Sequence, residues 1–242
     1  MILAAGLGRR LKPLTNDKPK ALVEVGGKPM IQWVLEKLEK EGFNEIIVNV
    51  HHFADQLIEF LNNYKSANLK IEISDESNFL LDTGGALLKA ADFLKGTEPF
   101  LIHNVDILST IDLQKFYNYH LENGALATLA VKKRKSFKYL LFNKNNELAG
   151  FHNEKTGESI FSTNSPSFLT KYGFSGIHVI SPEIFDLIIE KGKFSITNLY
   201  LRLARKNKIL AYIHNDDYWF DLGKRDQIIK AEDFIESGMM ET

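Results

Sequence analysis

The sequence predicts an α/β protein whose helices cover both faces of a mostly parallel β-sheet. Two observations predict this class. Short runs rich in β-branched residues alternate with amphipathic helical patterns through the first half of the 242-residue chain. The composition, with 44% hydrophobic and 25% charged residues, is that of a globular protein with a substantial core. Strand–helix alternation is typical of parallel strands joined by crossover helices, whose ligands bind beyond the carboxyl ends of the strands.

Each element of the first half follows from a local pattern. The run Glu45–Val50 (EIIVNV) is typical of a buried strand. Pro29 suits the first turn of a helix, apolar residues at helical spacing follow it, and Gly42 ends the helix. The expected strands are 1–5, 45–50, 69–73 and 100–102, and the expected helices are 29–41, 53–64, 83–94 and 113–121.

The pattern changes at Ala125, where short strands joined by turn residues predict antiparallel pairing. Residues 152–167 are polar and predict a long loop or a ragged hairpin. No repeat, low-complexity tract or linker divides the chain, so we expect a single domain, 1–242, with a small β lid or insertion. The expected strands are 125–131, 139–142, 148–151, 172–180 and 209–213, and the expected helices are 182–191, 196–206 and one that follows Gly223 and ends near Glu236.

Charge and cysteine content exclude several classes of function. The chain has 30 Lys and Arg against 31 Asp and Glu, so no overall field attracts a nucleic acid or an anionic membrane. The absence of cysteine excludes disulfides, thiolate metal sites and a cysteine nucleophile. No apolar stretch approaches the roughly 20 residues that span a bilayer. We therefore expect a cytoplasmic protein with no nucleic-acid or membrane partner.

A glycine-rich segment follows the first strand. Gly6 and Gly8 expose backbone amides without side chains in front of them, which suits an anion. Two prolines stiffen the segment that follows. From residue 9 to residue 20 the net charge is +4, because one acidic residue stands among five basic ones. The basic residues are Arg9, Arg10, Lys12, Lys18 and Lys20, and the acidic one is Asp17.

Two common phosphate-binding motifs do not fit this segment. A dinucleotide fingerprint needs a third glycine and an immediate helix, whereas Leu11 and Pro13 stand at those positions. A P-loop needs Gly-Lys followed by Ser or Thr at a fixed spacing, which the segment lacks. Backbone donors, guanidinium and ammonium groups on a stiff loop are nevertheless well suited to a polyphosphate.

The run AAGLGRRLKPLTNDKPKAL resembles the signature of the sugar-1-phosphate nucleotidyltransferases, G-x-G-x-R-[LM]-x-P-L-T-x-x-x-P-K, and matches it from Gly6 to Lys20. Residues 6–20 are called the signature loop below. The resemblance implies a Rossmann-like three-layer α/β/α fold, with a nucleotide-binding part of about 1–124 and a sugar-binding and lid part of about 125–242. It assigns catalytic roles on the triphosphate to Arg10 and Lys20, whereas Arg9 falls on a variable position. The implied nucleotide-binding residues of this segment are Leu3, Ala4, Ala5, Gly6 and Gly8.

Nucleotidyl transfer requires a divalent cation, and Mg²⁺ prefers one or two carboxylates together with phosphate oxygens. Asp106 follows the strand 100–102; from the residues alone it could equally cap a turn. The resemblance makes Asp106 a Mg²⁺ ligand, although Val105 stands where the family has glycine. Asp221, in Trp219-Phe220-Asp221-Leu222-Gly223, resembles the family's second metal ligand. Two nearby acidic alternatives are Asp216 and Asp217.

The expected contacts with the base and with the sugar lie outside the signature loop. Asp82-Thr83-Gly84-Gly85 is typical of a threonine-capped helix start, but it also resembles the family's E-T-G-G segment, which passes the nucleobase. This segment argues against the choline-phosphate cytidylyltransferase branch. The implied nucleobase contacts are Thr83, Gly84 and Gly85, and the implied sugar contacts are Asn104, Asn153 and Gly176.

The resemblance implies an enzyme of the EC 2.7.7 type, a monomer or small homo-oligomer, that converts an NTP and a sugar 1-phosphate into an NDP-sugar and pyrophosphate. In its compact length and in the segment Asp82–Gly85 the chain most resembles the N-acetylmuramate-1-phosphate uridylyltransferases, which implies UTP with N-acetylmuramate 1-phosphate, a cell-wall substrate. Mannose-1-phosphate guanylyltransferase and glucose-1-phosphate thymidylyl- or uridylyltransferase activities stay open. A non-catalytic nucleotide-sugar-binding subunit is disfavoured because all four catalytic and metal residues are present. A nicotinamide oxidoreductase is disfavoured by Leu11 and Pro13.

Overall fold

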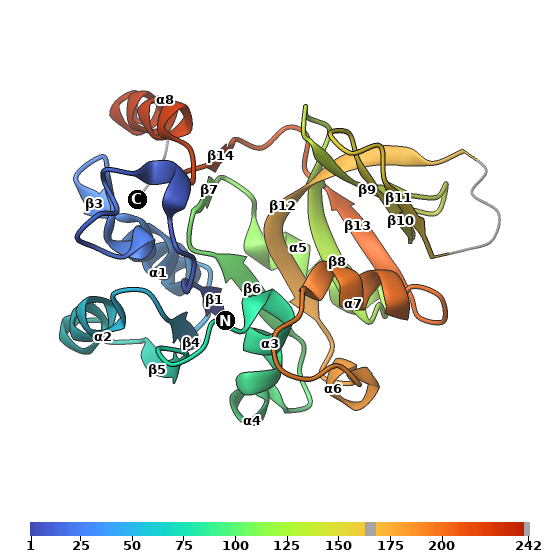
Figure 1. The fold of residues 1–242 in the computed structure, drawn as a ribbon, viewed down its shortest axis with the longest axis horizontal. Coiled ribbons are helices and arrows are strands. Elements are labelled where there is room, and N and C mark those ends of the chain that lie inside the picture. Colours follow the sequence, from blue (N-terminus) through green and yellow to red (C-terminus); the bar gives the residue numbers. More distant parts are fainter. Residues whose placement is uncertain (163–167, 240–242) are drawn as a thin grey trace. The chain divides into compact units, whose positions relative to one another are not determined.

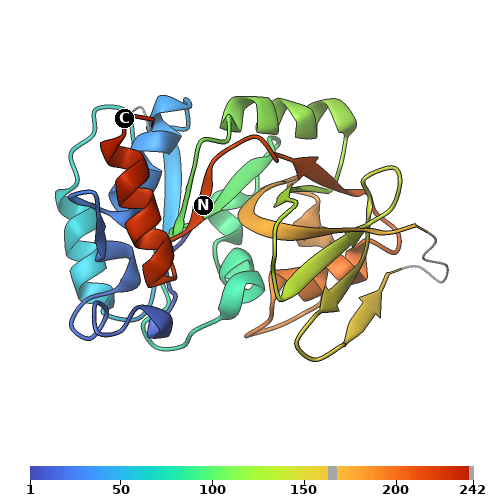
Figure 2. The same cartoon turned by 90° about the horizontal axis from the view of Figure 1, so that it is seen from above.

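The computed structural model describes residues 1–162 and 168–239 (Figures 1 and 2). The chain forms two compact units. Unit 1 contains residues 1–80, 103–112 and the chain from Tyr218 onward, and unit 2 contains residues 81–102 and 113–217. Among the described residues, no helix combines the length and the apolar character that crossing a membrane requires.

Unit 1 is built on parallel strands, as predicted. Strand β1 (Ile2–Leu3) pairs with β4 (Glu45–Val50) on one side and with the end of β6 (Phe100–Asn104) on the other. Strand β4 also pairs along its whole length with β5 (Lys70–Asp75). Residues 46–50 of β4 are all buried, which is the pattern of a strand covered on both faces. The helices of this unit are α1 (Met30–Lys40), α2 (Ala54–Asn63) and α8 (Arg225–Glu236).

Two short antiparallel pairs complete unit 1. Strands β2 (Glu24–Val25) and β3 (Lys28–Pro29) are joined by two glycines with φ of 57° and 78°, as a tight hairpin turn requires. Strands β7 (Ile107–Ser109) and β14 (Trp219–Asp221) pair over three residues. The signature loop itself contains the 3₁₀ turn Arg9–Leu11, and a second 3₁₀ turn, Lys20–Leu22, begins at its last residue.

One apolar cluster in unit 1 holds these pieces together. Leu11 of the signature loop, Leu108 of β7 and Leu222 after β14 are all almost completely buried in it, beside Trp33 of α1. Burying one such side chain contributes about 1.5–3 kcal/mol. The cluster therefore anchors the backbone next to Arg10, the backbone of β7 and the backbone next to Asp221. Its members are Leu11, Val23, Val25, Met30, Trp33, Leu108, Leu222, Ile228 and Ala231.

Unit 2 is dominated by antiparallel strands. The strands follow the order β11 (Ser159–Phe161), β10 (Leu148–Asn153), β9 (Lys138–Phe142), β12 (Thr170–Ile180), β8 (Ala127–Lys132) and β13 (Ile209–Ile213). Within this order only β8 and β13 run parallel. Strand β6 begins in this unit and ends in unit 1. The helices of this unit are α3 (Asp82–Lys89), α4 (Ala91–Leu94), α5 (Leu113–Asn123), α6 (Ile184–Leu187) and α7 (Ile196–Leu203).

The helices together with this mixture of parallel and antiparallel strands confirm the predicted α/β class with a mixed sheet, while several element boundaries differ. The helix expected over 83–94 is divided at Ala90 into α3 and α4. Only Ile184–Leu187 of the expected helix 182–191 is helical. The polar stretch 152–167 was expected to be a long loop or a ragged hairpin; it contains β11, which pairs antiparallel with β10, and its residues 163–167 lie outside the described part of the chain. Strands β2, β3, β7 and β14 were not predicted, because two or three residues are too few to show a period.

Three of the histidines buried in the core are His103 in unit 1 and His120 and His214 in unit 2. Burial lowers the pKa of His103 to about 3 and that of the other two to about 4. The folded chain therefore keeps these rings neutral well below pH 6.5, where the unfolded chain takes up protons. The free energy of unfolding should fall as the pH decreases below about 6.5.

We predict that unfolding at pH 5 takes up about one proton fewer in a His103→Gln variant than in the wild type. Each histidine that is neutral in the folded chain lowers the free energy of unfolding by about 1.4 kcal/mol for each pH unit of acidification. This holds between the pKa of the unfolded chain and the lower pKa of the folded chain. Urea unfolding of both proteins between pH 7.5 and pH 5 measures this slope. An identical pH dependence in the variant would show that His103 is already protonated in the folded chain.

Candidate active site

The first turn of the signature loop presents unpaired backbone donors. In the described part of the chain, the amides of Gly6, Leu7 and Gly8 donate to no protein atom. The carbonyl of Gly8 accepts from Leu11 N at 2.9 Å and from Thr15 Oγ1 at 3.0 Å, which closes the turn. Gly8 has a φ of 60°, and a Cβ there would lie 2.8 Å from Thr15 Cγ2, so only glycine fits. Successive backbone amides without a protein partner are a donor set suited to an anion.

Two cations of the signature loop contact two carboxylates. Lys20 Nζ forms an ion pair with Asp106 Oδ2, and the two side chains are only 12% and 14% exposed. Arg10 Nη1 lies 3.7 Å from Asp221 Oδ2, and its own side chain is 61% exposed. Lys224 Nζ is 3.3 Å from the same Asp221 oxygen. The structure therefore brings Arg10, Lys20, Asp106 and Asp221 together within unit 1.

The register of two short strands brings the carboxylates together. Asp221 of β14 is paired with Ile107 of β7, the residue directly after Asp106. The amide of Leu222 then donates to the carbonyl of Asp106 at 2.8 Å. Although the two carboxylates are 115 residues apart in sequence, the strand pairing fixes their backbones side by side.

Gly223 lies at the point where these groups converge. A Cβ at this position would lie 2.7 Å from Arg10 Nη2, 2.9 Å from Asp106 Oδ2 and 2.9 Å from Asp221 Oδ1. These distances are shorter than van der Waals contacts, so any other residue would push the charged groups away. Glycine at 223 therefore keeps one guanidinium and two carboxylates around one small space.

This donor set fits a hard divalent cation that shares its ligands with a substrate. Mg²⁺ commonly takes one or two protein carboxylates and fills its other positions with water and phosphate oxygens. Asp106 and Asp221 supply that number of carboxylates, and the missing Cβ of Gly223 leaves room beside them. Within residues 1–162 and 168–239, no cluster of three or more His, Cys, Asp or Glu side chains offers a protein-only site.

Sequence reasoning missed three residues of this site. Thr15 and Gly223 belong to the quoted motifs but received no role, although a threonine within the signature and a glycine two residues after Asp221 were visible signals. Lys224 had no motif to mark it. The acidic alternatives Asp216 and Asp217 belong to unit 2, where Asp217 Oδ2 lies 3.8 Å from His214 Nδ1.

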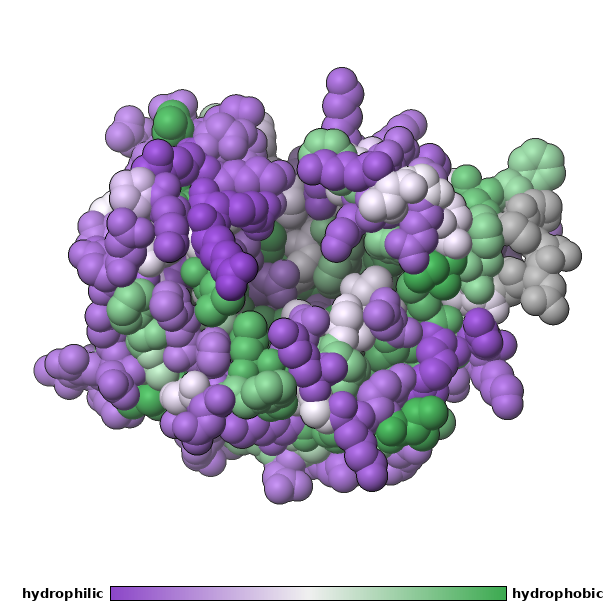
Figure 3. Space-filling model, viewed as in Figure 1, coloured by the Kyte–Doolittle hydropathy of each residue, from purple (hydrophilic) through white to green (hydrophobic). Residues whose placement is uncertain are grey.

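The space-filling view is consistent with a strongly polar surface here. Figure 3 shows hydrophilic side chains gathered over the signature loop and α8 of unit 1, at the upper left of the view. Asn104, an expected sugar contact, ends β6 two residues before Asp106 and pairs with Leu3 of β1. It is half-buried, and its carbonyl is hydrogen-bonded to the ring of His103.

The expected nucleobase residues begin helix α3 in unit 2. The amides of Gly84 and Gly85 donate to the carbonyl of Phe194 at 2.9 and 3.4 Å, so neither is a free donor. Thr83 Oγ1 accepts from Ile196 N at 3.0 Å instead of capping its own helix. A Cβ on Gly85 would lie 2.3 Å from Gly192 O. These small residues therefore allow α3 to pack closely against the chain before α7; their contact with a nucleobase stays a prediction.

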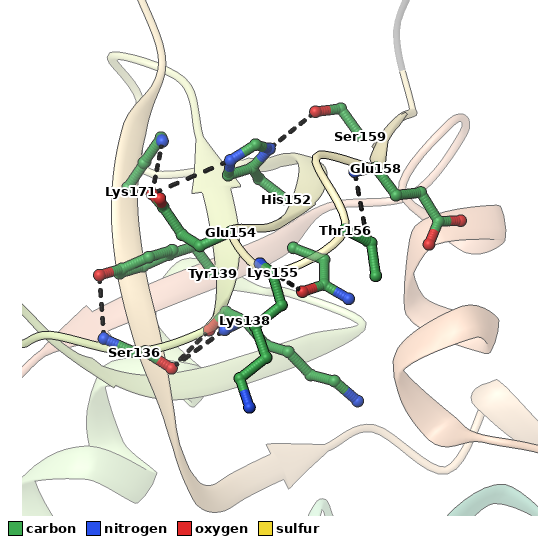
Figure 4. A network of polar contacts seen from close by, with 11 residues as sticks. Ser136, Lys138, Tyr139, His152, Glu154, Lys155, Thr156, Glu158, Ser159 and Lys171 are labelled. Carbon is green, nitrogen blue, oxygen red and sulfur yellow. Dashed lines mark hydrogen bonds and ion pairs between the residues drawn. The ribbon is translucent and has the colours of Figure 1, made fainter.

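The two remaining sugar-contact predictions also lie in unit 2. Asn153 ends β10, and its side-chain oxygen accepts from Lys155 N at 3.1 Å in the turn toward β11. Figure 4 shows the surrounding network, in which Glu154 lies between Lys171 and His152. Gly176 has a φ of 77°, within the segment of β12 where the register against β8 shifts. Both sugar contacts stay predictions.

Parallel strands, a loop whose amides have no partner among the described residues, and a cation–carboxylate cluster are together typical of α/β proteins that bind phosphates. The chain belongs to the nucleotidyl transferase family, whose pattern matches residues 1–238. The sequence-based expectation of a nucleotidyltransferase enzyme and of its fold class is therefore confirmed.

Three relatives illustrate the range of this similarity. N-acetylmuramate alpha-1-phosphate uridylyltransferase of Caulobacter vibrioides is 32% identical over 96% of this chain and 94% of its own length. Probable mannose-1-phosphate guanylyltransferase 1 of Oryza sativa subsp. japonica is 28% identical over 98% of this chain, which spans only 64% of that longer protein. The crystal structure of HddC from Yersinia pseudotuberculosis is 25% identical, with a TM-score of 0.76 over 97% of both chains.

We predict that Gly223→Ala weakens binding of inorganic tripolyphosphate at least fivefold without unfolding the chain. The added methyl group would displace Arg10, Asp106 and Asp221 from their common space. Calorimetric titration measures the affinity, and thermal unfolding reports on the fold. Gly96→Ala is the matched control, because a Cβ there meets no atom within 4 Å. Equal affinities for both variants would contradict the assigned role of Gly223.

Proposed function

We propose that this chain transfers a nucleotidyl group from a nucleoside triphosphate to a sugar 1-phosphate, with Mg²⁺ as cofactor and pyrophosphate as the second product. The observation that supports this most strongly is the convergence of Arg10, Asp106 and Asp221 on Gly223, in the same unit as the free amides of the signature loop. Membership of the nucleotidyl transferase family supports the same reaction class.

The reaction is an in-line displacement at phosphorus. A non-bridging oxygen of the sugar phosphate forms a bond to the α-phosphorus, the bond from that phosphorus to the α–β bridging oxygen breaks, and pyrophosphate leaves with the electron pair. The attacking group is already an anion, so no general base is required. Positioning and charge stabilisation must then supply the rate.

Each residue of the site has a role in this scheme. The amides of Gly6, Leu7 and Gly8 bind the triphosphate oxygens. Lys20 orients a phosphate group from its nearly buried position. Arg10 is exposed and only loosely paired with Asp221, so its guanidinium is available to follow the charge that develops on the phosphates during transfer.

The two carboxylates are the proposed ligands of the cofactor. Asp106 and Asp221 would hold Mg²⁺, which when bound neutralises charge on the α-phosphate. Without a bound substrate, Lys20 and Arg10 neutralise these carboxylates. A triphosphate offers the two cations a larger set of anionic oxygens, so they exchange one partner for another when it binds.

For the substrates, we propose UTP with N-acetylmuramate 1-phosphate, in the cytoplasm and in cell-wall metabolism. The 32% identity to the Caulobacter protein over nearly the whole of both chains supports this pair. Mannose 1-phosphate with GTP is the second candidate, supported by similarity to the longer rice protein. Glucose 1-phosphate with UTP is supported by 27% identity to a Synechocystis uridylyltransferase.

We predict Mg²⁺-dependent release of pyrophosphate with one NTP and sugar-1-phosphate pair from a panel of UTP, dTTP, GTP and CTP against N-acetylmuramate, mannose and glucose 1-phosphates. Arg10→Ala should lower turnover about 100-fold, the cost of removing a preorganised donor from a charged transition state. Arg9→Ala is the matched control and should stay within twofold of the wild type. The absence of release with every pair would favour a non-catalytic binding subunit instead.

A further inference from the structure

The start of the signature loop is held by a buried side chain from a different strand. Strand β1 ends at Leu3, so the next amides have no partner in the sheet ladder. Asn49 of β4 stands opposite Leu3, and its Oδ1 accepts from Ala4 N at 2.7 Å and from Ala5 N at 3.4 Å. Asn49 is 3% exposed. Its side chain therefore supplies the hydrogen-bond acceptor for these amides at the point where the chain leaves the sheet.

A buried glutamate sets the orientation of this amide. Asn49 Nδ2 donates to Glu76 Oε1 at 2.8 Å. The carboxylate accepts, so the amide nitrogen must face Glu76 and the amide oxygen must face Ala4 and Ala5. With this partner in place, the reversed orientation of Asn49 would put its oxygen against the carboxylate of Glu76.

The glutamate is itself fixed in place. Glu76 is 2% exposed, its amide donates to Val50 O at 2.8 Å, and its carbonyl lies 2.7 Å from His51 Nδ1. Burying a carboxylate is costly compared with burying an apolar side chain. An apolar pair could fill the same space, but it would leave the amides of Ala4 and Ala5 without an acceptor.

This arrangement determines which amides a ligand can use. The donor of Ala4, and more weakly that of Ala5, are already engaged by Asn49, whereas the next three amides have no partner among the described residues. The position of Asn49 thus decides where the anion-binding turn begins. Shifting Ala4 and Ala5 would also shift Gly6, which follows them directly.

We propose that Asn49 and Glu76 are positioning residues for nucleotide binding: Glu76 orients Asn49, and Asn49 holds the backbone that places the free amides of the signature loop. This inference rests on the proposed function, since the ligand it serves is the nucleoside triphosphate. Both side chains are buried, so each acts through the backbone it holds and not through direct contact with the substrate. Their effect is therefore expected on the nucleotide and not on the sugar phosphate.

The first test separates the two substrates. Asn49→Ala should raise the KM for the NTP at least tenfold and leave the KM for the sugar 1-phosphate within twofold. Leu57→Ala in α2 is the control for a general loss of stability, because Leu57 is a fully buried core residue outside this network. It should lower the melting temperature without changing either KM. If Asn49→Ala behaves like Leu57→Ala, the network is merely structural and the proposal is wrong.

The second test exchanges donor and acceptor. Asn49→Asp alone places two carboxylates against each other and should impair NTP binding as Asn49→Ala does. In the double variant N49D/E76Q, the new glutamine can donate to the new aspartate, which still accepts from Ala4 and Ala5. The double variant should recover at least fivefold in the KM for the NTP relative to N49D. Additive losses in the double variant would overturn the proposal.

A third measurement does not depend on turnover. Amide hydrogen exchange at Ala4 and Ala5 should accelerate at least tenfold in Asn49→Ala, and the affinity for inorganic tripolyphosphate should fall. If the wild type releases no pyrophosphate with any substrate pair, the proposed function fails, and these two readings still decide the positioning role. Unchanged exchange and unchanged affinity would contradict it.

Discussion

The site depends on holding two partly buried carboxylates next to each other. Asp106 and Asp221 repel one another, and they stay together because strands β7 and β14 pair in one register and because Gly223 has no side chain to separate them. Lys20 and Arg10 offset the repulsion from the signature loop. An apolar cluster and the hydrogen bonds at the start of the signature loop hold the backbone around this cluster of charges.

The support comes from apolar packing and from hydrogen bonds at different distances from the cluster. Leu11, Leu108 and Leu222 are buried in one core, and each lies within two residues of Arg10, Asp106 or Asp221. Farther away, Asn49 and Glu76 fix the point at which the chain leaves β1. The charged groups themselves are thus set by backbone positions that the core determines.

The sequence marks Arg10, Lys20, Asp106 and Asp221, and the structure brings them together, while their roles on a phosphate stay predictions. The signature from Gly6 to Lys20 is long, and its glycines, prolines and cations point to one chemistry. The parallel strands of unit 1 were also predicted, since β4 carries a clear β-branched run. The amino-acid sequence could not show the pairing of β7 with β14, because three-residue strands have no detectable period. Lys224 stayed hidden because nothing in the sequence shows that it reaches Asp221.

Other residues had a physical role that no motif reveals. The contact of Gly84 and Gly85 with a nucleobase stays a prediction; the structure adds that their amides donate to Phe194 and that their missing side chains allow close packing of α3. The partnership of Asn49 with Glu76 joins residues 27 positions apart, one on β4 and one directly after β5. Such contacts follow from strand register and side-chain orientation, which only the three-dimensional structure supplies.

The central claim is that Asp106 and Asp221 hold one metal ion beside a triphosphate bound to the signature loop. A crystal structure with Mn²⁺ and a non-hydrolysable nucleoside triphosphate tests it most directly. The account predicts an anomalous peak bound by both carboxylates, with triphosphate oxygens accepting from the amides of Gly6, Leu7 and Gly8. A metal bound elsewhere, or a triphosphate that leaves these amides unpaired, would contradict it.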